Sequence, residues 1–505
     1  MKTGRYTLLL VILLLGFAVL ACGCLNAEDT ASPSGDPNRT LTLADAAYGQ
    51  GQYRSASELY EQAGQEFIAA GNTSAALEAR NGKFRAVRMT LEYPYNLSGV
   101  MGAINETFPD VPAVRKEGWV APGESQQIVS DGEVLYYEGT VKNIYFHNLD
   151  LIRARTAKAG ETAIYDQAAV VALGPVPPGE GPYMNPVTFE GTGTLTIPRD
   201  TLPGNGTLRV WLPFPVETDV QRDVTVLSVE PAEYVVSGPD TTGDIGLVYL
   251  EIPLEETGPG DLIVSARFRF TGYEQRFSID PDKVGAYNTS DPGYLMYTGP
   301  GTNIVITPEM SGKARGIVGN ETNPYLQADM IYRYIIDTYP YSLAPHLMLN
   351  TAAIPESEYM LGTGFGDCGT QSMYFAALCR SLGIPARAVG GYQLLPGVEG
   401  THFWAEFYLP EYGWVPVDVT IAEAADWSFN ATPEEREAFR DYYFGNLDPY
   451  RYVIQKDVDI PLNPDPGDAV LFSTVHQKPA VLCDTCTKDI ELVAVEHWNM
   501  EFRRV

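Results

Sequence analysis

Basic residues are scarce in this sequence. Its 505 residues include 34 lysines and arginines against 64 aspartates and glutamates, which gives a formal net charge of −30 at pH 7. A chain with this excess of negative charge is a poor partner for nucleic acid, and charge does not draw it to anionic lipid. Hydrophobic residues make up 45% of the chain and aromatic residues 11%. These shares support packed cores, and the length predicts more than one domain.

Histidine and cysteine are also rare, with five and six residues respectively. The histidines stand at positions 147, 346, 402, 476 and 497, and only His402 lies in a patterned strand close behind a helix that bears a cysteine. Residues 93–300 hold no cluster of the residue types that bind metals. We therefore expect no cofactor, and the search for a catalytic site narrows to residues 366–420.

The stretch GDCGTQSMYFAALCRSLGIPARAVGGYQ, residues 366–393, begins with a helical pattern that opens at Cys368. Apolar residues recur at three- and four-residue spacing, and Gly383 ends the helix. A cysteine in the first turn lies where backbone N–H groups and the helix dipole stabilise a thiolate. The Asp367 carboxylate opposes a second negative charge, although we expect it to turn toward solvent, so a base is needed. Cys379, about three turns further on, is predicted to pack in the core.

His402 is the predicted base, because residues 402–409 alternate in the manner of a strand. A second alternating stretch follows from Gly413, and the segment between them is typical of a hairpin connection. A hairpin folded symmetrically about Pro410 places position 402 opposite position 418, where opposed Cβ atoms lie roughly 5 Å apart. Asp418 can then accept the imidazole N–H and orient the ring. Cys368, His402 and Asp418 thus follow one another as nucleophile, base and orienting acid.

Four motifs together resemble the transglutaminase-like superfamily, a branch of the papain-like cysteine enzymes. They are the GDCGT helix start, an H-x-W-x-E strand, a GW-x-P-V-D strand and FGNLDPYR at residues 444–451. The resemblance covers residues 305–457 and implies Cys368 as nucleophile, His402 as base and Asp418 as orienting acid. It also implies an oxyanion hole made of the nucleophile's backbone N–H and an upstream side chain, for which Tyr341 is our candidate.

The resemblance implies acyl transfer at amide bonds through a Cys368 thioester. Resolution of the thioester by water would make a peptidase or amidase, and resolution by an amine would make a transamidase; the sequence leaves this open. One alternative is a catalytically silent scaffold that keeps the fold for binding in the cell envelope. Another is a protein that binds partners through its N-terminal parts. The intact Cys, His and Asp favour the enzyme, with a protein or peptide of the cell envelope as its substrate.

The N-terminus predicts export. Lys2 and Arg5 precede an apolar run, and residues 1–21 have the form of a signal peptide. The run ends in a lipobox-like sequence, Val-Leu-Ala-Cys, in which Cys22 or its neighbour Cys24 would carry the lipid. An uncleaved membrane anchor is the alternative. Either would hold the protein at the outer face of the cell membrane, with residues 22–40 as a tether.

The rest of the chain divides by pattern into further predicted parts, and the expected fold class is α+β with several domains. The parts are a tetratricopeptide-like helical hairpin unit at 41–92, a mixed connecting region at 93–184, an antiparallel β-sandwich at 185–300, the catalytic core at 305–457 and a C-terminal extension at 458–505. The extension contains Cys483 and Cys486, flanked by His476 and His497. A disulfide, two free thiols or a zinc site would each fit these residues, with zinc the least favoured.

Overall fold

The computed structural model describes residues 36–159, 165–179, 181–427, 431–467, 469–472 and 476–505. The chain forms two compact units, one containing the residues up to Ile144 with Pro345–Ala352, the other containing Tyr145–Ala344 with Ala353–Val505. None of the helices in these described ranges is both long and apolar enough to cross a membrane. The predicted signal peptide and lipid-bearing cysteines lie outside the described residues.

The first unit is mainly helical, and α2 packs against both α1 and α3. Asp36 caps α1, and Pro37 takes its first position, so the helix begins four residues inside the stretch predicted to be a tether. The tetratricopeptide-like character of these helices stays a prediction. The elements are α1 (Pro37–Gly49), α2 (Tyr53–Ala69), α3 (Thr73–Leu91), α4 (Leu97–Thr107), α5 (Ala113–Trp119), β1 (Gln127–Ser130), β2 (Glu133–Tyr136) and α6 (Thr140–His147), the last ending in the second unit.

A short excursion of the predicted catalytic region belongs to the first unit. Pro345–Ala352 carries α12 (His346–Thr351), which packs against α3. The backbone N–H of Met348 donates to the carboxylate of Glu92 over 2.8 Å. The predicted domain range of 305–457 stays a prediction; within it, the chain leaves the second unit after Ala344 and returns at Ala353.

The second unit contains two antiparallel sheets built largely from the region predicted as a sandwich. Their orders are β12-β8-β3-β15, with β5 also paired to β8, and β14-β4-β7-β6. Whether they form a sandwich in the strict sense stays a prediction. The strands are β3 (Tyr183–Ile197), β4 (Thr207–Pro213), β5 (Gln221–Glu230), β6 (Val235–Asp240), β7 (Leu247–Pro253), β8 (Leu262–Arg276), β12 (Asn446–Leu447), β14 (Ala480–Cys483) and β15 (Trp498–Arg504).

The C-terminal extension is part of these sheets rather than an appendage. Its strand β14 pairs with β4, and its strand β15 pairs with β3 along the whole of Trp498–Arg504. The sequence had no local signal for these pairings, because each joins residues more than 250 positions apart.

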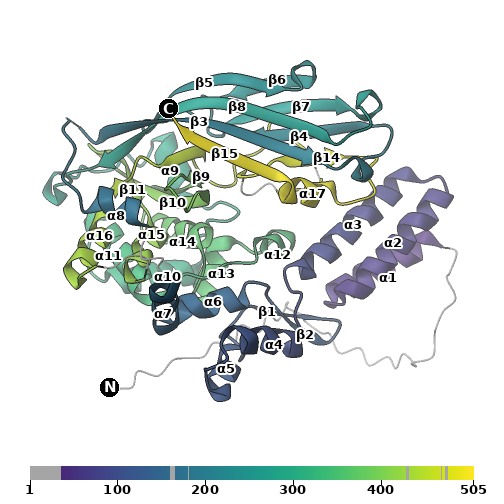
Figure 1. Ribbon diagram of the computed structural model, residues 1–505, viewed down its shortest axis with the longest axis horizontal. Coiled ribbons are helices and arrows are strands. Elements are labelled where there is room, and N and C mark those ends of the chain that lie inside the picture. Colours follow the sequence, from purple (N-terminus) through teal and green to yellow (C-terminus); the bar gives the residue numbers. More distant parts are fainter. Residues whose placement is uncertain (1–35, 160–164, 180, 428–430, 468, 473–475) are drawn as a thin grey trace. The chain divides into compact units, whose positions relative to one another are not determined.

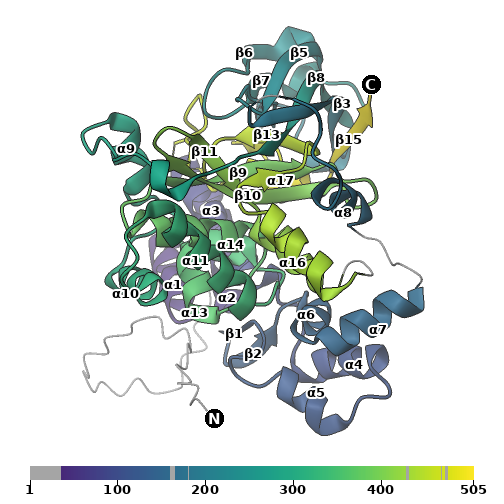
Figure 2. The same ribbon diagram turned by 90° about the vertical axis from the view of Figure 1, so that its left-hand side faces the viewer.

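A third sheet, β11-β10-β9-β13, carries the candidate site. Its strands are β9 (Ala386–Gln393), β10 (Gly400–Leu409), β11 (Gly413–Val417) and β13 (Arg451–Gln455). Figures 1 and 2 show β9, β10 and β11 between the helices α11, α14 and α16 on one side and β3, β7 and β8 on the other. Tyr452 of β13 stacks on Phe268 and Phe270 of β8, with ring centroids 5.2 and 5.5 Å apart. One hydrophobic core therefore joins this third sheet to the sheet that contains β8.

Helices of the second unit cover the site-bearing sheet. Asn323 caps α11, accepting from the N–H of Tyr325 over 3.0 Å. The mixture of helices and antiparallel sheets confirms the α+β class. The helices are α7 (Leu149–Ala159), α8 (Asp166–Ala172), α9 (Pro292–Thr298), α10 (Pro308–Val318), α11 (Pro324–Thr338), α13 (Glu356–Thr363), α14 (Cys368–Arg380), α15 (Val419–Glu423), α16 (Pro433–Tyr442) and α17 (Ile490–Glu496).

Candidate active site

Cys368 is the first residue of α14, as predicted, and its side chain is partly exposed. Asp367 caps the helix: its carboxylate accepts from the N–H groups of Gly369 and Thr370, both over 3.1 Å. Asp367 is only 7% exposed, so the expectation that it turns toward solvent is wrong. The first-turn amides hold the carboxylate in place, because they have no partner within the helix.

The rest of α14 is a core helix. Every residue from Gly369 to Arg380 is buried, and the Phe375 ring lies 6.2 Å from that of Phe407 on β10. Cys379 is fully buried, as predicted, and burial raises the pKa of its thiol. Of these two thiols, only Cys368 is open to a reagent, and a chemical probe can therefore tell them apart.

His402 and Asp418 meet, with Nε2 of the ring 2.8 Å from Oδ2 of the carboxylate. They do not meet as opposed strand residues. Leu409 pairs with Gly413 around a three-residue loop, which would put position 404, not 402, opposite 418. The strand β11 ends at Val417, and Asp418 is the cap of α15, where Oδ1 accepts from Ile421 N–H over 3.1 Å. The predicted register was wrong by two residues, and this shift preserved the contact because strand side chains alternate with a period of two.

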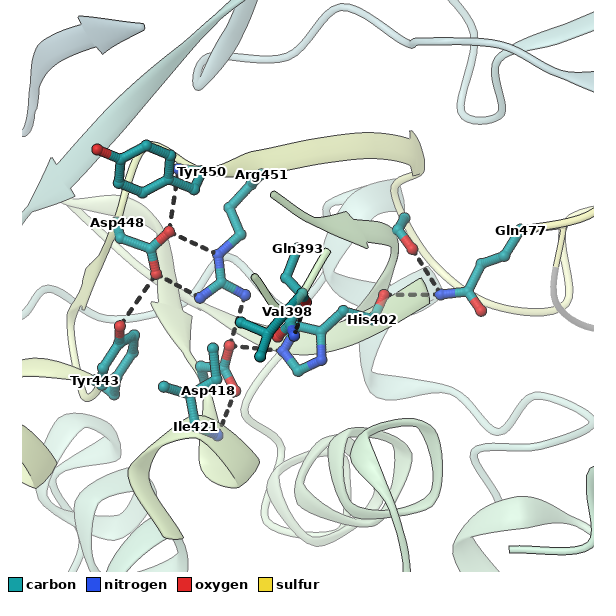
Figure 3. Close-up of polar contacts among 11 residues, drawn as sticks. Gln393, Val398, His402, Asp418, Ile421, Tyr443, Asp448, Tyr450, Arg451 and Gln477 are labelled. Carbon is teal, nitrogen blue, oxygen red and sulfur yellow. Dashed lines mark hydrogen bonds and ion pairs between the residues drawn. The ribbon is translucent and has the colours of Figure 1, made fainter. Parts of the chain in front are cut away.

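A second charged partner, Arg451, binds the same oxygen of Asp418. Nη1 of Arg451 lies 2.7 Å from Oδ2 of Asp418, and Nη2 lies 2.6 Å from Oδ2 of Asp448 (Figure 3). Tyr443 O–H and Tyr450 N–H also donate to Asp448, over 3.1 and 3.0 Å. All three charged side chains are buried. Arg451 and Asp448 lie in the FGNLDPYR motif, but no sequence pattern showed that they support the base.

The charges around Asp418 keep it ionised. Burial alone would raise the pKa of Asp418, but His402 and Arg451 outweigh burial and lower it to about 2. Two carboxylates and one guanidinium leave this buried cluster one negative charge in excess, which an imidazolium at His402 would neutralise. Because Nε2 donates to Asp418, Nδ1 is the ring nitrogen that can exchange a proton with a nucleophile.

Tyr341, our candidate for the oxyanion hole, lies near the nucleophile. Its backbone pairs with that of Gly366, two residues before Cys368, and its ring lies edge-on to Phe146 with centroids 4.8 Å apart. Burial, followed by the charges of Cys368 and Asp367, raises the pKa of its hydroxyl well above the usual value. A tyrosine kept neutral in this way can donate a hydrogen bond. Its role in an oxyanion hole stays a prediction.

Among the described residues, no group of three or more histidine, cysteine or carboxylate side chains could hold a metal ion. Cys483 and Cys486 form a disulfide, so their sulfurs are not the thiolate ligands that a zinc site would need. His476 is fully buried, and burial lowers the pKa of its ring to about 4. These residues belong to the structural part of the C-terminal extension.

We next compared the sequence with models of known protein families. A family model described as the transglutaminase-like superfamily matches residues 311–419, a range that contains Cys368, His402 and Asp418. This part of the chain belongs to the transglutaminase-like superfamily. The match ends before Arg451, so the charged support of Asp418 lies outside it.

Two curated proteins are similar in sequence to part of this chain. An uncharacterized protein of Haemophilus influenzae is 28% identical over 212 residues, 37% of this chain and 56% of that protein. A protein-glutamine gamma-glutamyltransferase of Pseudomonas aeruginosa is 32% identical over 111 residues, 20% of this chain and 16% of that protein. The chain therefore spans less than two thirds of either relative's length.

Two solved structures superpose on part of this chain with low TM-scores. One is a Cytophaga hutchinsonii protein proposed to be a cysteine protease, with a TM-score of 0.39, 13% identity and coverage of 64% of this chain and 92% of that chain. The other is the periplasmic domain of TgpA from Pseudomonas aeruginosa, with a TM-score of 0.24, 16% identity and coverage of 53% and 100%.

Proposed function

We propose that the chain is a transglutaminase-like cysteine enzyme that transfers acyl groups from amide bonds of peptide or protein substrates. The observation that carries the proposal is the 2.8 Å contact of His402 with Asp418. His402 lies on β10, which packs against α14, the helix that starts at Cys368. A nucleophile at a helix start, a base and a buried orienting carboxylate are the parts that such chemistry requires.

The reaction would proceed in two steps. The Cys368 thiolate attacks the amide carbonyl carbon, the C–N bond breaks, and His402 gives its Nδ1 proton to the departing amine. This leaves a thioester and a neutral imidazole. The imidazole then takes a proton from water or from an amine, whose attack forms an acid or a new amide and regenerates the thiolate and the imidazolium. The backbone N–H of Cys368, with Tyr341 as a candidate second donor, would stabilise the oxyanion.

Glutamine side chains are the first substrate to test, because one relative is described as a protein-glutamine gamma-glutamyltransferase. A glutamine-containing protein is incubated with the chain, with and without a primary amine, and its mass is followed. Incorporation of the amine indicates transamidation, a gain of about 1 Da indicates deamidation, and cleavage indicates a peptidase. Cys368→Ala must abolish the change; activity that survives this variant would refute the proposal.

The catalytically silent scaffold is the second candidate, and no observation favours it over the enzyme. It predicts that Cys368 has the reactivity of an ordinary thiol, whereas the enzyme predicts a thiolate near neutral pH. The buried Asp418, Asp448 and Arg451 weigh against it, because three buried charges are costly to keep without a use.

We also propose that the protein is exported and anchored by a lipid at Cys22 or Cys24. The double variant Cys22→Ser with Cys24→Ser should release a normal-sized protein from the membrane fraction or leave the signal peptide uncleaved. Fractionation and intact mass measure both outcomes, with Ser32→Ala as the control. A double variant that stays in the membrane fraction with an unchanged mature mass would show that neither cysteine is the anchor.

A further inference from the structure

Gln477, in the C-terminal extension, bonds directly to the backbone of the catalytic strand. Its side-chain nitrogen Nε2 donates to the carbonyl oxygen of His402 and to that of Gly391, both over 2.8 Å (Figure 3). His402 and Gly391 face each other across β10 and β9. One side chain thus joins the two strands at the register position of the candidate base.

The bonding capacity of Gln477 matches this task. A glutamine amide nitrogen has two hydrogens, and here each has one carbonyl oxygen as its acceptor. The side chain carries no net charge, so it bonds to the backbone without placing a second ion beside His402. Gln477 is 8% exposed, and bonds of this kind are not replaced by water when they are lost from a buried position.

The backbone around Gln477 is itself fixed to the sheets. Its carbonyl oxygen accepts from the Tyr392 hydroxyl over 2.9 Å, and the N–H of His476 donates to the side chain of Gln455 on β13 over 2.9 Å. Tyr392 in turn accepts from the indole N–H of Trp498 on β15 over 3.2 Å. The strand β14, which follows three residues later, pairs with β4. Hydrogen bonds to neighbouring strands therefore hold the backbone that presents this amide to β9 and β10.

We infer that Gln477 is a positioning residue for His402, an inference that rests on the proposed function. The ring must keep Nε2 at 2.8 Å from Asp418 while Nδ1 serves the thiol. Catalytic geometry of this kind tolerates displacements of roughly 0.5 Å. Gln477 lies beyond the residues 311–419 that match the superfamily, so this support is supplied by the chain's own extension.

The test compares two glutamines that make the same kind of bond. Gln221 is buried, and its Nε2 donates to the carbonyl oxygens of Val216 and Val453, both over 2.8 Å. Methionine replaces either residue with little change in volume and without donors. Iodoacetamide alkylation of Cys368 is measured from pH 5 to pH 10 by peptide mapping of the full chain. In Gln477→Met we expect the rate at pH 6 to fall about tenfold or more, with rates that converge with wild type at high pH.

Gln221→Met should lose stability but keep the wild-type pH profile. A Gln477→Met profile that coincides with the Gln221→Met profile would overturn the inference, because the bond would then be merely structural. If Gln477→Met fails to fold, Gln477→Asn serves, since its amide is short by roughly 1.5 Å and cannot reach both carbonyls; a wild-type profile there overturns the inference too. A wild-type chain without reactivity at pH 6 would instead refute the proposed function itself.

Discussion

Asp418→Asn should lower turnover by on the order of 10²-fold or more. Oδ2 of Asp418 accepts from both His402 and Arg451, and Oδ1 caps α15 at Ile421. An asparagine has only one side-chain oxygen, so it can accept either from His402 and Arg451 or from the Ile421 N–H. If its oxygen keeps the cap, its N–H₂ faces His402 and favours the ring tautomer with the proton on Nδ1, which cannot act as a base toward Cys368. If the side chain flips, the cap is lost.

The same variant should also be less stable than wild type, because one of the two bonded sides of Asp418 loses its partner in either orientation. The sequence alone reveals neither the cap at Ile421 nor the bond with Arg451 on which this expectation rests. Asp459→Asn is the control: Asp459 accepts two hydrogen bonds from Asn303, at 2.8 and 2.6 Å, outside the site. Full turnover in Asp418→Asn, measured beside this control, would remove Asp418 from the mechanism.

Arg451→Met should destabilise the fold by about 3–5 kcal/mol. The variant leaves Asp418 and Asp448 buried together without the guanidinium that lies between them. The surface residue Arg333 is the matched control, because it also pairs with several carboxylates but its side chain is 38% exposed. Arg333→Met should cost no more than about 1 kcal/mol. Equal losses of unfolding free energy in the two variants, measured by urea unfolding, would show that the buried cluster stabilises the fold no more than the surface pairs do.

The pH dependence of Arg451→Met follows from Asp418. In the wild type the pKa of Asp418 is lowered to about 2, below its usual value, so its stabilising effect is present above about pH 4 and is lost as pH falls through 2. Without Arg451, one of the two charges that lower the pKa is gone, and the folded-state value rises. Acidification from pH 7 to pH 3 should therefore remove less stability from the variant than from the wild type, and free energies of unfolding measured at pH 3, 4 and 7 would show it.

The sequence predicted that His402 meets Asp418, but it did not predict the hairpin register correctly. The helix start at Cys368 and the strand around His402 follow from periodicity, which is local. The hairpin register does not, because it depends on the turn: Glu411 takes a positive φ of 73° and Gly413 one of 86°, which centres the loop on Glu411 rather than on Pro410. Asp418 still reached His402, because an error of two residues leaves a side chain on the same face.

Three of the features that sequence reasoning missed are long-range. Arg451 meets Asp418 across 33 positions and Gln477 meets His402 across 75. No periodicity records such pairs, and a buried arginine looks like a surface arginine in sequence. The excursion at Pro345–Ala352 was missed for the same reason, because its partner Glu92 lies 256 positions from Met348.

The proposed pairing of Cys368 with His402 is tested most directly by the pH profile of Cys368 alkylation in the wild type and in His402→Ala. Cys379 is buried, and Cys483 and Cys486 are joined in a disulfide, so glutathione in the same tube is the reference thiol. We predict alkylation of Cys368 that is already fast at pH 6, with the His402→Ala profile moved toward that of a free thiol, near ~8.5. A wild-type Cys368 that reacts no faster than glutathione at pH 6 would contradict the thiolate–imidazolium pair.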